Sequence, residues 1–485
     1  MELEKLLEGV EILETNAPTQ LNICAVTDSS RDVAPGALFI AVTGYAADGH
    51  RYIPDALKRG AALVVCEREM PSEVPWVRVK NARLAMARIG ANFYGRPADK
   101  MKIVGITGTN GKTSVTYLLK DLLEEALGAK VGLIGTIHNM IGDRVIGGER
   151  TTPGAMELQR VLSDMYDSGC EYVLMEVSSH ALVQERVAQI PFSVGAFTNL
   201  TEDHLDFHHT MEEYGKAKAM LFRRCKDGVF YMDDPSANVM MKDATCLKST
   251  VGLTEKADIY ATDIVLASDH IAMKVHEGEM TEVLKLGIPG RFTVSNSLVV
   301  LGIARKLGID LKTAVAALSK AKGVKGRIEV VPAENCDFTV LIDYAHTPDG
   351  LENVLRSVRD FCRGRIITVF GCGGDRDRTK RPMMGKIAMD HSDFVIVTSD
   401  NPRTEEPMSI IADILDGMKD IKIPYIVEEN RRKAIRIALH QAQKDDIIIL
   451  AGKGHETYQI IGTEKNHLDE REEVASALCE MQQSH

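Results

Sequence analysis

The chain has 485 residues, of which 45% are hydrophobic and 26% are charged. This balance is typical of a folded globular protein, and the length predicts about three domains at roughly 100 to 200 residues each. The formal net charge of −11, without a long basic run, disfavours binding to nucleic acid through its phosphates.

The first segment, MELEKLLEGVEILE, is acidic and lacks the basic flank and the apolar stretch of a signal peptide. No run of about 18 apolar residues follows it, so no membrane-spanning helix is expected. The sequence therefore favours a cytoplasmic protein with no membrane partner.

Residues 1–98 are expected to form a small α/β domain. Short β-like runs occur at 37–42 and 62–66, and a helix-like stretch follows at 83–94. The turn-forming segment 95–99 then comes directly before an apolar run. We therefore place the first domain boundary there, after residue 98.

Residues 99–327 alternate β-rich runs with helix-period stretches, a pattern typical of a parallel sheet with crossover helices. The expected strands and helices are, in turn, 101–107, 130–137, 171–178 and 192–199, then 112–126, 156–168, 211–224, 293–306 and 311–321. This pattern predicts a central, doubly wound domain.

Residues 328–485 show the same alternation again. The expected strands are 338–343, 366–370, 393–398, 424–427 and 446–450. We therefore expect a Rossmann-like C-terminal domain, and the whole chain is predicted to be an α/β protein of three domains.

A glycine loop with the sequence GTNGKT joins the expected strand 101–107 to a helix. It contains Gly108, Thr109, Asn110, Gly111, Lys112 and Thr113. Glycines let backbone N–H groups turn toward phosphate oxygens, the lysine supplies charge, and the threonine hydroxyl can bind Mg²⁺. The loop is shorter than GxxxxGK[ST], which requires Gly where the chain has Ile106. The alternative is a glycine turn with a surface lysine, but the flanking strand and helix favour an ATP phosphate loop.

Four further motifs accompany this loop: Thr151-Thr152-Pro153, Glu176-Val177-Ser178-Ser179-His180, an NLTEDHLD run at 199–206, and Asp400-Asn401-Pro402-Arg403. Together they resemble the Mur ligases of peptidoglycan synthesis, over residues 28–459, and among them the third-step ligases. The resemblance implies ATP-driven amide formation through an acyl phosphate on the D-Glu side chain of UDP-N-acetylmuramoyl-L-Ala-D-Glu. It also implies meso-2,6-diaminopimelate as the incoming amine, Mg²⁺ as cofactor, and a monomer.

The resemblance also implies roles for residues around ATP. Thr113, Glu176 and His204 would hold Mg²⁺, although a capping glutamate and a surface histidine are the plainer alternatives. Lys218 would be an N6-carboxylysine, with Lys216 as a rival two positions away. Catalysis is assigned to Lys112, Lys218, His204 and Arg327. ATP binding is assigned to the phosphate loop together with Asn296, Arg327 and Asp343.

Two substrate sites follow from the same resemblance. The UDP-substrate is assigned to Ser30, Tyr45, Thr151, Thr152, Ser178, Gln184 and Arg186, with Tyr45 in a position where some relatives carry His. Diaminopimelate is assigned to Arg376, Asp400, Asn401, Pro402, Arg403, Gly452 and Glu456. A planar Arg fork suits the distal carboxylate that distinguishes diaminopimelate from lysine.

Several alternatives stay open at this point. The lysine-adding ligase of the same step, the D-Ala-D-Ala-adding ligase and the folylpolyglutamate synthetases are enzyme rivals. A catalytically silent nucleotide-binding partner is a rival from another class. Such a partner would be expected to lack Lys112, Glu176, His204 or Lys218, and all four residues are present.

Overall fold

The computed structural model describes residues 1–18, 20–44, 47–71, 74–148, 150–333, 336–419 and 423–483. The chain divides into two compact units. The first unit comprises Met1–Ile259 and Leu298–Ala314, and the second comprises Tyr260–Ser297 and Val315–His485. Among the helices of the described ranges, none is both long enough and apolar enough to cross a membrane.

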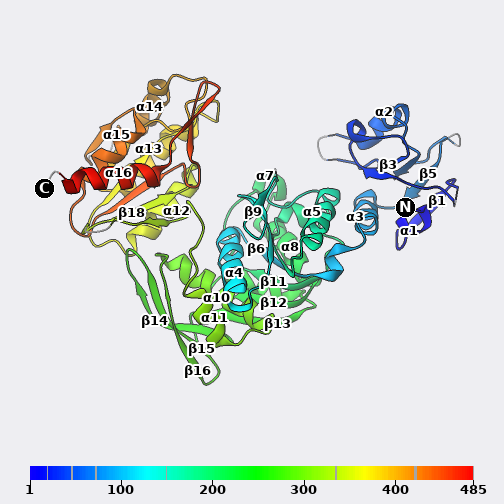
Figure 1. Ribbon diagram of the computed structural model, residues 1–485, viewed down its shortest axis with the longest axis horizontal. Coiled ribbons are helices and arrows are strands. Elements are labelled where there is room, and N and C mark those ends of the chain that lie inside the picture. Colours follow the sequence, from blue (N-terminus) through cyan, green and yellow to red (C-terminus); the bar gives the residue numbers. More distant parts are fainter. Residues whose placement is uncertain are drawn as a thin grey trace. The chain divides into compact units, whose positions relative to one another are not determined.

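The N-terminal part of the first unit has a sheet of its own (Figure 1). Its strands lie in the order β1 (Ile12–Thr15), β5 (Trp76–Val79), β4 (Leu63–Cys66), β3 (Ala37–Ile40) and β2 (Ala25–Thr27). The short helices are α1 (Leu3–Leu6), η1 (Ser30–Asp32), η2 (Gly49–Tyr52) and α2 (Ile53–Lys58). Asn81 caps α3 (Ala82–Phe93) by accepting from the Arg83 and Leu84 amides. These elements match the predicted strands and helix.

The second sheet of the first unit contains the predicted parallel strands. From one side it runs β13 (Leu247–Gly252), β12 (Cys225–Tyr231), β11 (Phe192–Phe197), β6 (Lys102–Thr107), β10 (Tyr172–Glu176) and β7 (Val131–Ile134), then antiparallel β8 (Asn139–Ile141) and β9 (Arg144–Ile146). The chain extends from β6 in both directions, so β6 lies at the topological switch point, where open α/β sheets bind ligands.

Helices connect these strands as predicted. They are η3 (Pro97–Lys100), α4 (Lys112–Leu127), α5 (Ala155–Asp167), α6 (Ser179–Val183), α7 (Leu205–His208), α8 (Met211–Ala219), η4 (Met220–Arg223) and α9 (Ala237–Lys242). Then come β14 (Ile259–Leu266), β15 (Ile271–Glu277) and β16 (Met280–Leu286), of which β15 and β16 pair antiparallel. The sequence analysis predicted neither these three strands nor β12 and β13. α10 (Arg291–Lys306) and α11 (Leu311–Leu318) follow them.

The C-terminal sheet belongs to the second unit. Its order is β17 (Glu329–Val331), β18 (Thr339–Asp343), β22 (Ile447–Ala451), β19 (Ile366–Phe370), β20 (Phe394–Val397) and β21 (Tyr425–Val427). All neighbours are parallel except β17 and β18. The strands predicted in this region are therefore present.

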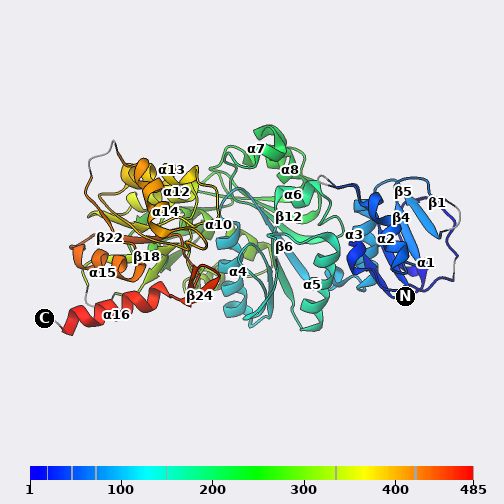
Figure 2. The same cartoon turned by 90° about the horizontal axis from the view of Figure 1, so that it is seen from above.

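Helices cover both faces of the C-terminal sheet. One apolar core includes α12 (Pro348–Arg359), α13 (Lys380–His391) and α14 (Pro407–Asp416), and the other includes α15 (Arg431–Gln441) and α16 (Glu470–Gln483). Figure 2 shows α12 and α13 on one side of β18 and β22, with α15 and α16 on the other. A hairpin of β23 (Tyr458–Ile461) and β24 (Glu464–His467) precedes α16. Because helices cover both faces, a ligand can reach this sheet at the carboxyl ends of its strands, where polar residues follow the strands.

Candidate functional site

The glycine loop follows β6 and leads into α4, as predicted. Gly108 and Gly111 have φ of 150° and 85°, a region that favours glycine. A Cβ on Gly108 would lie 1.9 Å from the Thr198 hydroxyl oxygen, so no side chain fits there. Lys112 donates from Nζ to the carbonyls of Gly108 and Thr109 at 2.9 and 2.8 Å. The loop thus has the backbone freedom that phosphate binding requires.

The segment after β11 holds this loop from the side. The Asn110 amide donates to Asn199 Oδ1 at 2.9 Å, and the Thr109 amide donates to the Asn199 carbonyl at 2.9 Å. The Thr198 hydroxyl donates to the Asn110 carbonyl at 2.6 Å. The first residue of the NLTEDHLD motif, Asn199, therefore supports the phosphate loop.

Glu176 ends β10, beside β6, and its side chain is almost fully buried. Its Oε1 accepts from the Thr113 hydroxyl at 2.9 Å, and its Oε2 accepts from the Thr136 hydroxyl at 2.9 Å. The N-cap of the following helix α6 is Ser178. Glu176 therefore faces the phosphate loop.

Lys218 is buried on α8 and donates from Nζ to the Gly108 carbonyl at 2.7 Å. Burial, and after it the charge of Lys112, lowers the pKa of Lys218 well below its usual value. Lys216 is exposed and pairs with Glu212 at 2.6 Å. Of the two rivals, Lys218 is therefore the one beside the phosphate loop.

His204 begins α7 in a left-handed conformation, with φ of 54°, and its side chain is exposed. Its ring centroid lies 5.0 Å from that of His180. Its Nε2 lies 3.4 Å from Asp203 Oδ2. The structure thus places His204 at the surface of the site, and its metal role stays a prediction.

Oxygen atoms beside the phosphate loop bear on the predicted magnesium site. In the described part of the chain, no three His, Cys, Asp or Glu side chains form a group that could hold a metal. Thr113 and Glu176 nevertheless offer two oxygens that lie 2.9 Å apart. Because Mg²⁺ keeps several waters and takes only one or two protein ligands beside nucleotide phosphates, these two residues fit it.

Five of the predicted UDP-substrate residues form one hydrogen-bonded group. Thr151 Oγ1 lies 3.0 Å from Thr136 Oγ1, and the Ser178 amide donates to Thr152 Oγ1 at 3.1 Å. Arg186 donates to the Thr152 carbonyl at 2.8 Å and to Gln184 Oε1 at 2.7 Å. Burial, and then the nearby charges of Arg150 and Arg83, lowers the pKa of Arg186. The group therefore suits a ligand with carboxylates.

Of the other two, Ser30 lies on η1, between β2 and β3 of the N-terminal sheet, and Tyr45 lies outside the described residues. Their predicted contacts with the uridine nucleotide stay predictions.

Asn296, Arg327 and Asp343 lie in the second unit. The amides of Ile328 and Ala345 each donate to the Asp343 carboxylate at 2.8 Å. Burial raises the pKa of Asp343 to about 6, against the opposing effect of Arg327. Asn296 is buried on α10. The contact of these three residues with ATP stays a prediction.

A pocket lies where the parallel strands β18, β22, β19 and β20 end. It contains six of the seven residues assigned to the amino acid, namely Arg376, Asp400, Asn401, Arg403, Gly452 and Glu456. Pro402 is buried between Asn401 and Arg403. The pocket also contains residues that were not predicted, namely Tyr344, His346, Gly371, Cys372, Gly373 and Lys380.

Lys453 was also missed, and it lies fully buried behind this pocket. Its Nζ donates to Asn401 Oδ1 at 3.0 Å and lies 3.5 and 3.8 Å from the carboxylates of Glu456 and Asp400. Its place between Gly452 and Glu456, two residues assigned to the amino-acid site, was the available signal. Lys453 compensates the two acidic side chains and holds them in place.

The chain matches three domain families in sequence. They are described as Mur ligase family, catalytic domain, over residues 22–94; Mur ligase middle domain, over 106–304; and Mur ligase, glutamate ligase domain, over 326–454. Together these ranges cover most of the chain.

Two full-length relatives carry the name UDP-N-acetylmuramoyl-L-alanyl-D-glutamate--2,6-diaminopimelate ligase. The one from Caldanaerobacter subterraneus subsp. tengcongensis is 48% identical, with 99% of each chain covered. The one from Clostridium acetobutylicum, numbered ligase 1, is 46% identical, with 99% of this chain and 100% of the relative covered.

A solved structure of a ligase of the same name has a TM-score of 0.76 and 31% identity, with 99% of both chains covered. A MurF ligase from Thermotoga maritima in complex with ADP has a TM-score of 0.58 and 18% identity, with 95% of this chain and 98% of that chain covered. The first likeness confirms the predicted three-domain α/β fold, and the second shows the fold alone.

Proposed function

The chain belongs to the Mur ligase family, and from that premise we propose that it joins meso-2,6-diaminopimelate to UDP-N-acetylmuramoyl-L-Ala-D-Glu with ATP. The full-length relatives that carry this name, at 46% and 48% identity, support the proposal. The setting is peptidoglycan precursor synthesis in the cytoplasm, and the protein acts as a monomer.

The reaction begins with transfer of the γ-phosphoryl group of ATP to the D-Glu side-chain carboxylate. A carboxylate oxygen forms the new bond to phosphorus, and the bond to ADP breaks. Such transfers depend on positioning and charge neutralisation. Lys112 and the loop amides would hold the phosphates, and Thr113 with Glu176 would hold Mg²⁺, which neutralises charge on the transferring group.

The amine of the incoming amino acid then attacks the carbonyl carbon of the acyl phosphate. A carbon–nitrogen bond forms, phosphate leaves and the amine loses a proton. Lys218 is suited to the proposed carbamylation, because burial favours the neutral amine that reacts with CO₂. Arg186 and the hydroxyls around it would hold the muramoyl dipeptide.

The composition of the pocket is the observation that carries the choice of amino acid. The distal end of diaminopimelate has an ammonium and a carboxylate on one carbon. The pocket offers Arg403 and Arg376 beside Asp400 and Glu456, which are complementary to such an end. Lysine has no distal carboxylate, so the two arginines favour diaminopimelate over the lysine-adding alternative.

The test is amino-acid-dependent release of phosphate from ATP, with UDP-N-acetylmuramoyl-L-Ala-D-Glu as acceptor. Meso-diaminopimelate and L-lysine are compared side by side at equal concentration. We expect turnover with diaminopimelate alone. Turnover mainly with lysine would contradict the assigned pocket, and no turnover with either would favour the catalytically silent partner.

A further inference from the structure

Arg381 is a fully buried arginine near the start of α13, beneath two loops that form the amino-acid pocket. The first loop, residues 371–379, follows β19, and the second loop, residues 400–406, follows β20. Arg381 donates from Nη1 and Nη2 to the two carboxylate oxygens of Glu405 at 2.9 and 2.7 Å. Nη2 also lies 3.4 Å from the Gly373 carbonyl oxygen. One guanidinium therefore contacts both loops.

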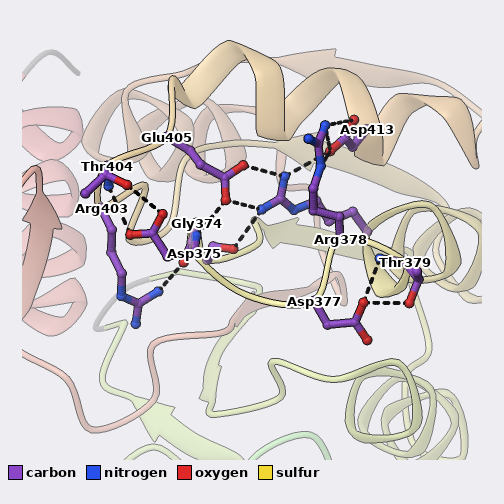
Figure 3. Close-up of polar contacts among 11 residues, drawn as sticks. Gly374, Asp375, Asp377, Arg378, Thr379, Arg403, Thr404, Glu405 and Asp413 are labelled. Carbon is purple, nitrogen blue, oxygen red and sulfur yellow. Dashed lines mark hydrogen bonds and ion pairs between the residues drawn. The ribbon is translucent and has the colours of Figure 1, made fainter.

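Glu405 transmits this contact to the rest of the first loop. Its Oε1 accepts from the Asp375 amide at 2.6 Å. The neighbouring Thr404 hydroxyl donates to Asp375 Oδ1 at 2.7 Å. Arg403 donates from Nη1 to the Gly374 carbonyl at 2.8 Å, as Figure 3 shows. The loops are thus joined by consecutive bonds from Arg403, Thr404 and Glu405.

Two residues of these loops have a backbone conformation that side chains rarely adopt. Asp375 has φ of 53° and Arg403 has φ of 52°. Such conformations persist where surrounding contacts hold them, and they cluster at ligand sites. The bonds of Glu405 and Thr404 to Asp375 hold the first loop, and the Arg403 amide donates to the Ile460 carbonyl of β23 at 3.1 Å. Without the bonds to Asp375 we expect that residue to relax toward an ordinary backbone conformation and to move the neighbouring Gly374 carbonyl that Arg403 contacts.

We propose that Arg381 is a positioning residue for the amino-acid substrate, because by holding Glu405 it fixes the orientation in which Arg403 meets the distal carboxylate. Arg381 acts through Glu405 and the loop backbone. The inference rests on the proposed function, since it concerns the same pocket.

Arg378 provides a matched control on the same segment. It donates from Nε and Nη2 to the Asp413 carboxylate at 3.1 Å each, and Arg381 donates to Asp413 at 2.9 Å. Of these two arginines, as the structure describes them, Arg381 alone also contacts Glu405. Arg378→Met therefore removes an arginine–Asp413 pair and leaves the contact between the loops intact.

The experiment compares wild type, Arg381→Met, Arg378→Met and the double variant Arg381→Met/Glu405→Met. The KM for meso-diaminopimelate, the KM for ATP, kcat and the thermal midpoint are measured for each. For Arg381→Met we expect the KM for diaminopimelate to rise about 10- to 100-fold, the scale of a misplaced binding group. Both kcat and the KM for ATP should stay within about twofold, and Arg378→Met should match wild type in all three constants.

The double variant separates positioning from stability. The double variant leaves no unpaired carboxylate at position 405, so its thermal midpoint should be higher than that of Arg381→Met. Its KM for diaminopimelate should stay raised, because Asp375 still lacks its partner. Recovery of both quantities together would overturn the positioning role, as would an equal rise of KM in Arg378→Met or parallel losses in kcat and the KM for ATP.

The wild-type reaction distinguishes failure of this inference from failure of the proposed function. An active wild type with an unchanged KM in Arg381→Met would overturn the inference alone. A wild type without turnover of diaminopimelate would overturn the proposed function, and this inference with it.

Discussion

Lys218 carries an amine into the interior of the first unit, where the residue is 2% exposed. Burial, followed by the charge of Lys112, lowers the pKa of this amine, so the folded chain binds its proton more weakly than the unfolded chain. Below the folded pKa this difference lowers the free energy of unfolding. This lowering of the free energy of unfolding disappears as the pH rises from the pKa in the folded chain to the pKa in the unfolded chain.

We expect Lys218→Met to raise the free energy of unfolding at pH 7 by about 0.5 to 2 kcal/mol, since it removes a buried amine whose pKa the folded chain lowers. The variant should also lose ligase activity and regain part of it with added short carboxylates, which replace the carbamate. Urea unfolding in CO₂-free buffer and phosphate release measure the two effects. Lys216→Met is the control, because that exposed side chain pairs only with Glu212 at the surface in the described contacts. A less stable Lys218→Met would contradict the argument.

The C-terminal helix α16 is attached to its sheet by a buried ion pair. Glu470 accepts from Arg431 Nε at 2.8 Å, and both side chains are 0% exposed. Arg431, the first residue of α15, also donates to the Ala451 carbonyl at 2.9 Å, where β22 ends. Ala451 directly precedes Gly452 of the pocket. The pair therefore links α15, α16 and the strand end that leads into the site.

Glu470→Ala should lower the free energy of unfolding by about 3 to 5 kcal/mol, because it leaves the Arg431 charge buried without its partner. Chemical denaturation followed by circular dichroism measures the change. The matched control is Glu472→Ala, in the same turn of α16, whose exposed side chain pairs with His467. That variant should stay within about 0.5 kcal/mol of wild type. A loss below about 1 kcal/mol for Glu470→Ala would show that water reaches Arg431.

The parallel strands that could be predicted are those with both faces covered. β19 and β22 are buried at every residue and read as unbroken apolar runs. β15 alternates buried with partly or fully exposed residues and pairs antiparallel with β16. Because its apolar residues alternate with more exposed ones, no continuous apolar run distinguishes β15 from a loop, and the sequence analysis missed this region.

The residues of the candidate site also separate into some that could be predicted from the sequence and some that could not. The phosphate loop was recognisable because it combines glycines with a lysine and a threonine directly after a strand, and Asp400–Arg403 was assigned through the family resemblance. Arg381 carried no such signal, and Lys453 carried only its place between Gly452 and Glu456, because arginine and lysine are almost never fully buried unless paired. Their partners Glu405 and Asn401 are distant in sequence and meet them only in the folded sheet.

At the scale of the whole molecule, the phosphate loop and the amino-acid pocket lie in different compact units. We therefore expect calorimetric unfolding in two transitions. Diaminopimelate at 100 times its Kd should stabilise the second unit by about 2.7 kcal/mol and leave the transition of the first unit in place. Arg403→Ala should remove this shift. A single transition that diaminopimelate raises as a whole would contradict this expectation.

The bonds between residues 371–379 and residues 400–406 also bear on the entropy and the rate of binding. Both loops are ordered by their own contacts before any amino acid arrives. Ordering a long side chain on association costs about 0.5 to 1.5 kcal/mol, and here that cost falls on folding of the chain. The amino acid therefore meets a preorganised pocket, and differences in affinity between competing amino acids should arise mainly in their dissociation rates.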